Sequence, residues 1–262
     1  MLFRSVIEKR KTEIARDGMV TYFEILTLLA VLYFAERKVD FGVFEIGMGG
    51  RLDATNALPA CLSVITPVSF DHEEHLGRTL AKIAAEKAAI IKENGRVVCG
   101  RQKPEARRVI EKEIKKKSAR AVFYGSVFQT FREKMSLHGS QFDFKMNARI
   151  FRNLHVRLPG KFQIENAALS VAAALTLEGS GQIRLSERAI RKGLLKAFWP
   201  GRFEMIKHRG RTFILDGAHN DASMSAMMDS VKKLFPAKRR VVIFGVSREK
   251  NLSRTLGPLA GN

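Results

Sequence analysis

The stretch that decides the fold is VDFGVFEIGMGG, residues 39–50, in which a mostly apolar run ends in a cluster of glycines. An apolar run of this length closed by glycines predicts a short buried strand at 39–46. Upstream, residues 21–36 predict an apolar helix, and its most apolar run, 23–35, is predicted to be buried. The run is not a membrane span, because it contains Glu24 and is well short of the roughly 20 residues that a span needs.

Strand and helix patterns continue to alternate downstream. Apolar runs rich in β-branched residues predict strands at 62–68 and 96–99, and helical periodicity predicts a helix at 80–92 between them. Residues 5–16 carry alternating charges at helical spacing and predict a further helix. Strands that alternate with helices indicate parallel βαβ units, so the first part of the chain is predicted to be an α/β domain with a parallel sheet.

The pattern then changes twice along the chain. Apolar and polar residues alternate with period two within 121–158, which predicts antiparallel strands appended to the parallel sheet, and an alanine-rich helix is predicted at 166–177. After Trp199-Pro200-Gly201 a second α/β pattern begins. Its predicted elements are a strand at 212–215, a helix at 223–234 and a strand at 240–244. We therefore expect two domains, 1–197 and 198–262, with the boundary near 196–202 and the second a partial Rossmann-like domain.

Composition sets the class of protein. A chain of 262 residues with 45% hydrophobic residue types is enough for one sizeable core and part of a second. Its only cysteines, Cys61 and Cys99, exclude a disulfide framework and a four-thiolate zinc site, and favour a reducing cytoplasm. The first residues pass straight into charged ones, so we expect no secretory signal and no membrane partner.

The formal net charge of +20 suggests a polyanionic partner, and nucleic acid is the first candidate. The basic residues are spread through amphipathic stretches such as 109–120, and aromatic residues do not alternate with them as in base-stacking proteins. A solvated basic surface is therefore the preferred interpretation, and an anionic small-molecule substrate would also be served by it. We expect no nucleic-acid partner.

Two polar residues follow predicted strands, at the edge where open α/β sheets bind ligands. Glu45 closes the strand at 39–46 and His72 follows the strand at 62–68, and such a carboxylate and imidazole suit a magnesium ion. The glycines at 47–50 allow backbone to approach a ligand closely. The phosphate-loop motif is absent, because the Gly160-Lys161 pair is followed by Phe162 rather than by Ser or Thr.

Taken together, six ordered blocks resemble the folylpolyglutamate and dihydrofolate synthases of the Mur ligase superfamily. The blocks are Thr21-Tyr22-Phe23-Glu24, the run from Phe44 to Asn56, Asp71-His72 with Leu76-Gly77 and 83–92, Gln163 with Asn166-Ala167-Ala168, Trp199-Pro200-Gly201-Arg202, and Leu215-Asp216-Gly217-Ala218-His219-Asn220. The resemblance covers essentially the whole chain. It implies a Mur-ligase-type central domain followed by part of the C-terminal domain.

The resemblance also implies a site. Glu45 and His72 would bind magnesium, and Lys87 matches a lysine that relatives carry as a carbamate formed with carbon dioxide. The residues that match ATP contacts are Asn166, Arg202, Asp216 and His219. The segments that match those holding the pterin end are Thr21, Tyr22, Phe23 and Glu24, and Leu52, Asp53 and Ala54.

The implied reaction is the ligation of L-glutamate to dihydropteroate or to a folate. ATP phosphorylates the acceptor carboxylate, and the amine of L-glutamate then attacks the acyl phosphate. Neither cysteine is needed as a nucleophile. Two other readings stay open: another Mur-type amino-acid ligase, and a non-catalytic fragment that binds nucleotide or polyanions through its charge.

One departure from the family pattern concerns the phosphate loop, which relatives place before the Thr-Tyr-Phe-Glu block. Only about twenty residues precede that block here, and the serine ligand of magnesium in the same region has no counterpart. We therefore expect the chain to be a fragment that needs the missing N-terminal segment, with little or no ligase activity alone. A monomer is the expected oligomeric state.

Overall fold

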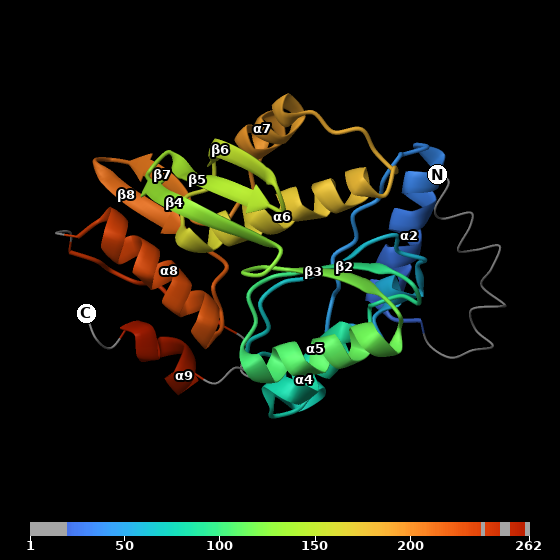
Figure 1. The fold of residues 1–262 in the computed structure, drawn as a ribbon. Coiled ribbons are helices and arrows are strands. Elements are labelled where there is room, and N and C mark those ends of the chain that lie inside the picture. Colours follow the sequence, from blue (N-terminus) through green and yellow to red (C-terminus); the bar gives the residue numbers. More distant parts are fainter. Residues whose placement is uncertain (1–19, 237–238, 247–251, 260–262) are drawn as a thin grey trace. The chain divides into compact units, whose positions relative to one another are not determined.

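The computed structural model describes residues 20–236, 239–246 and 252–259 (Figure 1). The chain divides into two compact units, Met1–Ala60 and Cys61–Asn262. The helix predicted at 5–16 lies outside the described residues. Among the described helices, none combines the length and the apolar character needed to cross a lipid bilayer.

The first unit is built on the predicted apolar helix, α2 (Tyr22–Glu36), which is followed by a short 3-10 helix, η1 (Ala54–Ala57). The prediction that this helix is buried was wrong, because none of its residues is buried. The described part of the unit is only about forty residues long, which is too small to enclose a helix that is apolar on every side.

The strand predicted at 39–46 was also wrong. These residues have no strand assignment, and the Val43 side chain is 91% exposed. A strand needs a neighbour to hydrogen-bond its backbone, and no described strand pairs with this segment. Apolar and β-branched composition alone was therefore not sufficient to form the element here.

The second unit contains the predicted parallel sheet. Its strands are β1 (Ser63–Ile65), β2 (Arg96–Cys99) and β3 (Arg120–Phe123), in the order β1-β2-β3 with parallel pairing. The helices that connect them are α3 (Glu73–Leu76), α4 (Leu80–Ala88) and α5 (Pro104–Lys116). The βαβ prediction is confirmed, with one correction. Residues 121–123 were predicted to belong to the antiparallel strands, but they form the third parallel strand.

An antiparallel sheet follows, as predicted from the period-two pattern. Its strands are β4 (Phe128–Ser136), β5 (Gly139–Met146) and β6 (Arg149–Val156). The long helix α6 (Lys161–Gly179) runs between this sheet and β2, and α7 (Glu187–Lys196) packs on β6 (Figure 1). The combination of parallel sheet, helices and appended antiparallel strands is therefore confirmed.

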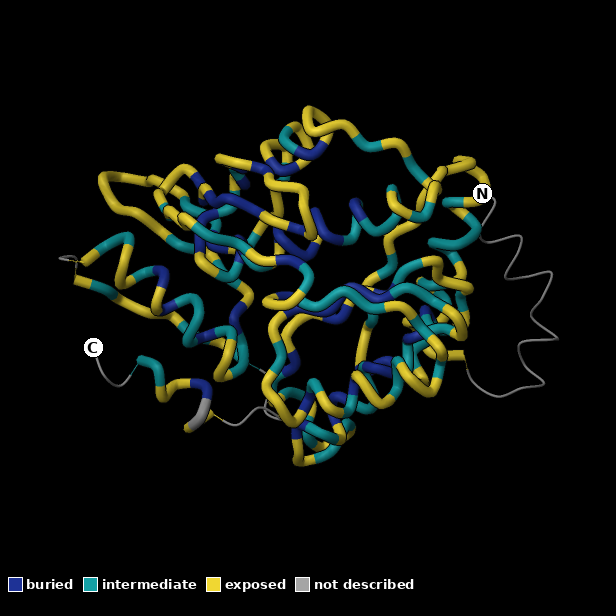
Figure 2. Tube along the Cα trace, in the orientation of Figure 1, coloured by how far each residue is buried: buried dark blue, intermediate teal, exposed yellow. Residues whose placement is uncertain are grey.

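The two larger of the three core clusters lie on opposite faces of β2, and the third, around Met224 and Met228, lies at α8. Val98 packs with α6 and the antiparallel sheet, whereas Val97 and Cys99 pack with α4 and α5. Successive side chains of a strand point to opposite faces, so this one strand contributes to both clusters. Figure 2 shows the buried residues concentrated along the sheets and α6.

The C-terminal part consists of an antiparallel pair, β7 (Glu204–His208) and β8 (Arg211–Leu215), then α8 (Asp221–Leu234), α9 (Leu252–Leu256) and η2 (Gly257–Leu259). The strand predicted at 240–244 was wrong, for the same reason as the one at 39–46. No described strand pairs with it, and Val241 and Ile243 are 84% and 97% exposed. The boundary at 196–202 stays a prediction.

The two cysteines are expected to differ sharply in reactivity. Cys99 is fully buried, and burial raises its pKa to about 11, whereas Cys61 is exposed. The thiolate is the reactive form, so at neutral pH a thiol reagent should label one equivalent quickly and the second only after denaturation. Counting labelled thiols in the Cys61→Ser variant checks this. Fast labelling of that variant in the folded state would contradict the buried position of Cys99.

Candidate active site

Asp71 joins two segments of the second unit that lie far apart in the sequence. Its Oδ2 atom accepts a hydrogen bond of 3.0 Å from the Asn220 side chain and lies 3.4 Å from His219 Nε2. Its Oδ1 atom accepts a hydrogen bond of 2.9 Å from the backbone N–H of His72. The Asp71-His72 block and the block that ends at Asn220 therefore meet at one carboxylate.

The start of α8 holds His219 in place. Asn220 caps the helix, with its side chain accepting from the Ser223 backbone N–H and the Ser223 side chain accepting from Asn220 in return. His219 Nδ1 lies 2.8 Å from the Gly217 carbonyl oxygen, which leaves Nε2 facing Asp71. Acceptor oxygens thus face both ring nitrogens of His219.

His72 and Lys87 belong to the two helices that follow β1, at the N-cap of α3 and in the last turn of α4. His72 takes a left-handed backbone conformation, with φ of 48°, at the N-cap of α3, and its imidazole is partly exposed. Non-glycine residues in this conformation are uncommon and concentrate at functional sites. Lys87 lies half-buried in the last turn of α4; burial lowers its pKa, and the negative charge of Asp71 opposes this shift.

Asp216 organises the loop between β8 and α8. Its two carboxylate oxygens accept hydrogen bonds of 2.8 Å from the backbone N–H groups of Phe203 and Ala218. Arg202 lies directly beside this loop, since a Cβ at position 217 would be 3.4 Å from its guanidinium. The predicted nucleotide residues Arg202, Asp216 and His219 are thus brought together around Gly217.

Asn166, the remaining predicted nucleotide residue, lies on the exposed face of α6. Its side-chain amide donates a hydrogen bond of 3.1 Å to Gln163, one turn earlier on the same helix. Gln163 is buried and in turn has a fixed position. The amide of Asn166 is therefore oriented while its other hydrogen-bonding positions remain open to solvent.

The predicted pterin residues lie in the first unit, and two of them have a local structural task. Thr21 and Glu24 form a capping box at the start of α2: the Thr21 hydroxyl accepts from the Glu24 N–H at 3.2 Å, and the Glu24 carboxylate accepts from the Thr21 N–H at 2.7 Å. The backbone hydrogen bond from Thr21 lowers the pKa of Glu24. Tyr22 is 77% exposed beside them.

Asp53 organises the glycine loop of the same unit. Its carboxylate accepts from the backbone N–H groups of Gly47 and Met48, at 2.8 and 2.9 Å, and from both the N–H and the hydroxyl of Thr55. A Cβ at Gly47 would lie 2.6 Å from the Phe23 ring, so a side chain there would require the ring to move. On either side of Asp53, Ala54 begins η1 and the Leu52 side chain is 93% exposed.

The predicted magnesium site stays a prediction. Glu45 belongs to the first unit, and His72 and Lys87 to the second. Within the described ranges, no three His, Cys, Asp or Glu side chains gather as metal ligands. The magnesium ligands predicted from the sequence include only two residues of these types, Glu45 and His72, because the third ligand would be a carbamate formed on Lys87.

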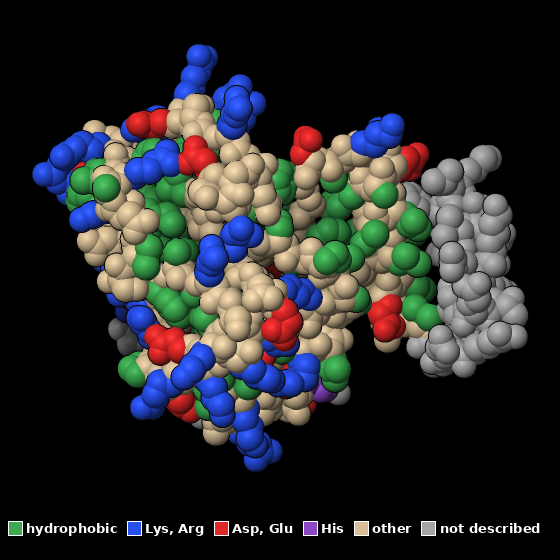
Figure 3. Space-filling view, turned by 45° about the vertical axis from the view of Figure 1, so that its right-hand side comes forward, with side chains coloured by type: hydrophobic (Ala, Val, Ile, Leu, Met, Phe, Trp, Pro, Cys, Tyr) green, Lys and Arg blue, Asp and Glu red, His purple; other side chains and the backbone are tan. Residues whose placement is uncertain are grey.

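The basic surface charge is spread over the molecule. In the view of Figure 3, Lys and Arg side chains form several separate groups interrupted by acidic and apolar ones. Several cations are paired locally, as in the Lys117–Glu93 ion pair at 2.6 Å and the Arg107–Glu111 pair at 2.8 Å. This distribution supports the interpretation of a solvated basic surface.

Asp71 is the residue that the sequence argument missed. From the sequence, Asp71 stood out only as the neighbour of His72, although its side chain bonds across 149 positions to Asn220. A signal was present, because Asp71 and Asn220 both belong to blocks that follow predicted strands. The two strands belong to different sheets, β1 to the parallel sheet and β8 to the antiparallel pair, so the strand pattern does not say which residues touch.

Comparisons with known proteins agree with this arrangement. Residues 3–174 match the Mur ligase middle domain, and residues 201–261 match the Mur ligase glutamate ligase domain. A dihydrofolate synthase/folylpolyglutamate synthase of Bacillus subtilis is 40% identical over 234 residues, which are 89% of this chain and 54% of the relative. The chain therefore spans about half the length of the curated relatives it matches.

Two solved structures give the same result. An FPGS–AMPPCP–folate complex superposes with a TM-score of 0.92 at 31% identity, covering 98% of this chain and 62% of that chain. A Mycobacterium tuberculosis folylpolyglutamate synthase complexed with ADP superposes with a TM-score of 0.88 at 31% identity, covering 98% of this chain and 57% of that one.

Proposed function

The chain belongs to the Mur ligase family, and from this we propose that it takes part in the ATP-dependent ligation of L-glutamate to dihydropteroate or to the γ-carboxylate of a folate. The observation that carries the proposal is the meeting of two blocks at Asp71. One block holds His72, the predicted metal ligand, and the other holds His219 beside Asp216, which are predicted to contact ATP. Phosphoryl transfer requires a metal and a nucleotide at one place.

At the nucleotide end, the proposed roles follow the chemistry of the side chains. Arg202 offers a planar, permanently charged guanidinium to phosphate oxygens. The Asp216 oxygens already accept backbone N–H groups but keep free lone pairs for ribose hydroxyls. Asn166 presents an oriented amide, which can donate to and accept from a base.

At the metal end, Glu45, His72 and a carbamate on Lys87 would hold Mg²⁺, which offsets negative charge on a transferring phosphoryl group. Lys87 is suited to carbamate formation, because only a neutral amine adds to carbon dioxide and burial lowers the pKa of Lys87. Nζ attacks the carbon of CO₂, loses one proton to water and becomes a carbamate anion. Through its two oxygens, Asp71 would hold the His72 backbone and the His219 ring in fixed positions.

The proposed reaction needs no covalent intermediate with the protein. A carboxylate oxygen of the acceptor attacks the γ-phosphorus of ATP and ADP leaves, which gives an acyl phosphate. The amine of L-glutamate then attacks the acyl carbon, phosphate leaves, and an amide forms with loss of a proton. The exposed side chains of Tyr22 and Leu52 are proposed to contact the pterin end. A cytoplasmic monomer is the proposed setting.

Carbamate formation at Lys87 is a testable expectation. Because burial lowers the pKa of Lys87, its amine is neutral at a lower pH than that of an ordinary lysine, and its carbamate should persist to lower pH. Lys117 is the opposite case, since its hydrogen bond to Glu93 raises its pKa. Carbon-13 NMR with labelled bicarbonate should show a carbamate signal that the Lys87→Arg variant lacks and the Lys117→Arg variant keeps. An unchanged signal in Lys87→Arg would remove the carbamate from the proposal.

The function is tested by nucleotide binding to the 262-residue chain. Isothermal titration with Mg²⁺ and AMPPCP should show one site, and Asn166→Ala should weaken it roughly tenfold, which corresponds to about 1.4 kcal/mol. Ser170→Ala, one turn along the exposed side of the same helix, is the control and should bind normally. Binding of tripolyphosphate as strong as that of AMPPCP, lost with added salt, would favour the non-catalytic polyanion-binding alternative.

A further inference from the structure

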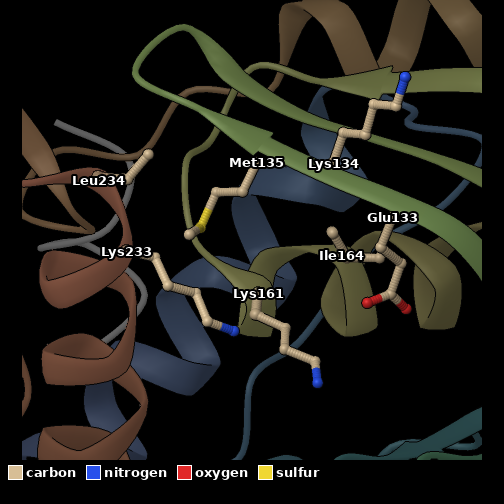
Figure 4. A pocket seen from close by; sticks show the side chains of 7 residues that line it. All are labelled: Glu133, Lys134, Met135, Lys161, Ile164, Lys233 and Leu234. Atoms are coloured by element: carbon tan, nitrogen blue, oxygen red, sulfur yellow. The ribbon is translucent and has the colours of Figure 1, made fainter. Parts of the chain in front are cut away.

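A polar pocket lies within the second unit, formed by β4, the first turn of α6 and the last turn of α8 (Figure 4). Its volume is about 300 Å³. None of the residues that line it is among those predicted to contact ATP, magnesium or the pterin. Its apolar part consists of Met135, Ile164 and Leu234.

The charged part of the pocket has a definite pattern. The ammonium groups of Lys161 and Lys233 end on the same side of the pocket, and the Glu133 carboxylate lies beside Ile164 (Figure 4). The third lysine, Lys134, lines the pocket with its stem while its ammonium points away (Figure 4). The pocket thus presents two cations and one anion.

These charges are available to a ligand. Neither Lys161 nor Lys233 forms an ion pair with any residue in the described part of the chain. Elsewhere on the surface such pairs do form, between Arg107 and Glu111 and between Lys117 and Glu93. Glu133 accepts one hydrogen bond, of 2.7 Å, from the Thr130 hydroxyl, which leaves most of its lone pairs unused.

The N-terminal end of α6 adds to the positive potential. Gly160 caps this helix without a side-chain hydrogen bond, and its first turn contains no acidic residue, so no carboxylate there offsets the positive end of the helix dipole. Lys233 has a competing structural explanation, because a cation in the last turn of α8 favours that helix. Lys161 has no such structural explanation, because a cation in the first turn of a helix is unfavourable. An unfavourable lysine next to a cavity is better explained by a ligand.

We propose that this pocket binds a glutamyl unit. Such a unit carries two carboxylates for the two ammonium groups, a nitrogen with N–H for Glu133, and methylene groups for Met135, Ile164 and Leu234. Inorganic phosphate fits less well, because it has no N–H donor for Glu133 and no apolar part. The unit comes from two sources, free L-glutamate with its ammonium, or a γ-glutamyl chain with its amide N–H.

The inference rests on the proposed function, because a ligase of L-glutamate meets this unit both as substrate and in the growing product. Lys161 lies five residues before Asn166 on α6, about 7.5 Å along the helix axis. Five residues also turn the helix by about 140°, so the pocket lies within two turns of Asn166 but on a different side of α6. A glutamyl unit held here would therefore be kept close to the nucleotide end of the proposed site.

The test is a titration of the 262-residue chain with L-glutamate, with tri-γ-glutamate and with inorganic phosphate, all without nucleotide. We expect at least one glutamyl probe to bind with one-to-one stoichiometry, and the probe that binds identifies the source. The Lys161→Gln/Lys233→Gln variant should bind it at least tenfold more weakly. Lys232→Gln is the matched control, because Lys232 lies next to Lys233 in the last turn of α8 but does not line the pocket, and should bind normally.

Three results would overturn the proposal: no binding of either glutamyl probe, equal weakening in the control variant, or phosphate binding as tight as that of the glutamyl probes. The same samples are titrated with AMPPCP, which the double variant should bind as the wild type does. Glutamyl binding without AMPPCP binding would leave the pocket in place and remove the proposed ligase function. AMPPCP binding without glutamyl binding would leave the proposed ligase function in place and remove the proposed glutamyl pocket.

Discussion

Replacing Asp216 with alanine is expected to lower the free energy of unfolding by about 2–4 kcal/mol, because it removes two charge-assisted hydrogen bonds at once. Asp216 accepts from the backbone N–H groups of Phe203 and Ala218, both at 2.8 Å. Phe203 is 1% exposed and has a left-handed φ of 50°, so its N–H would be left without a partner in a strained conformation.

The experiment also separates the structural task of Asp216 from its proposed contact with ribose. Trp199, the single tryptophan, lies two residues before Gly201, which hydrogen-bonds to Gly217 in the same loop, so its fluorescence reports on this region in urea titrations. Asp216→Asn keeps one carbonyl acceptor and should lose less stability. If Asp216→Asn is nearly as stable as the wild type and still binds AMPPCP with unchanged affinity, the ribose role is wrong. If Asp216→Ala is fully stable, the structural account is wrong.

Replacing Phe144 with alanine is expected to lower the free energy of unfolding by about 3–5 kcal/mol. Phe144 is fully buried in β5, and its ring centroid lies 6.1 Å from those of both Phe128 and Phe151, on the two neighbouring strands. Truncation removes the packing contacts of a buried ring and leaves a cavity between three strands and α6. The variant therefore tests the core of the second unit.

Ile150→Ala is the matched control for this change. Ile150 lies on β6 next to Phe151 but is 49% exposed, so its truncation should lower the free energy of unfolding by less than about 1 kcal/mol. Urea unfolding followed by far-ultraviolet circular dichroism measures both. Similar losses for the two variants would mean that the side chains on β6 and β5 face the wrong way in the structure.

The elements that could be predicted from sequence are those whose stability depends on neighbours within the same unit. The strand at 96–99 was predicted with its observed bounds, because β2 is the central strand of the parallel sheet and is buried on both faces. The strands predicted at 39–46 and 240–244 have the same kind of composition but no described partner. Amino-acid composition indicates that a segment can be buried on the faces of a sheet. It does not indicate whether another strand lies beside the segment to hydrogen-bond its backbone.

The candidate site was predicted almost entirely from resemblance, and the physical arguments contributed little to it. The pairing of Glu45 with His72 assumed a strand at 39–46 that does not form. The link between Asp71 and Asn220 depends on where two distant loops meet, which no periodicity encodes. A local rule was left unused: a Thr three residues before a Glu at the start of an apolar run indicates the capping box that Thr21 and Glu24 form.

The exposed apolar side of α2 has a practical consequence for handling the protein. Tyr22, Phe23, Leu26, Leu28 and Tyr33 all remain at least 38% exposed on one helix, and patches of this kind promote self-association. Mutual repulsion between chains of net charge +20 opposes that association. Repulsion is screened within about 10 Å at 0.1 M salt, and sulfate strengthens apolar contact further. The chain should therefore stay dispersed in dilute buffer and precipitate early in ammonium sulfate, so purification by salting-out will select for aggregates.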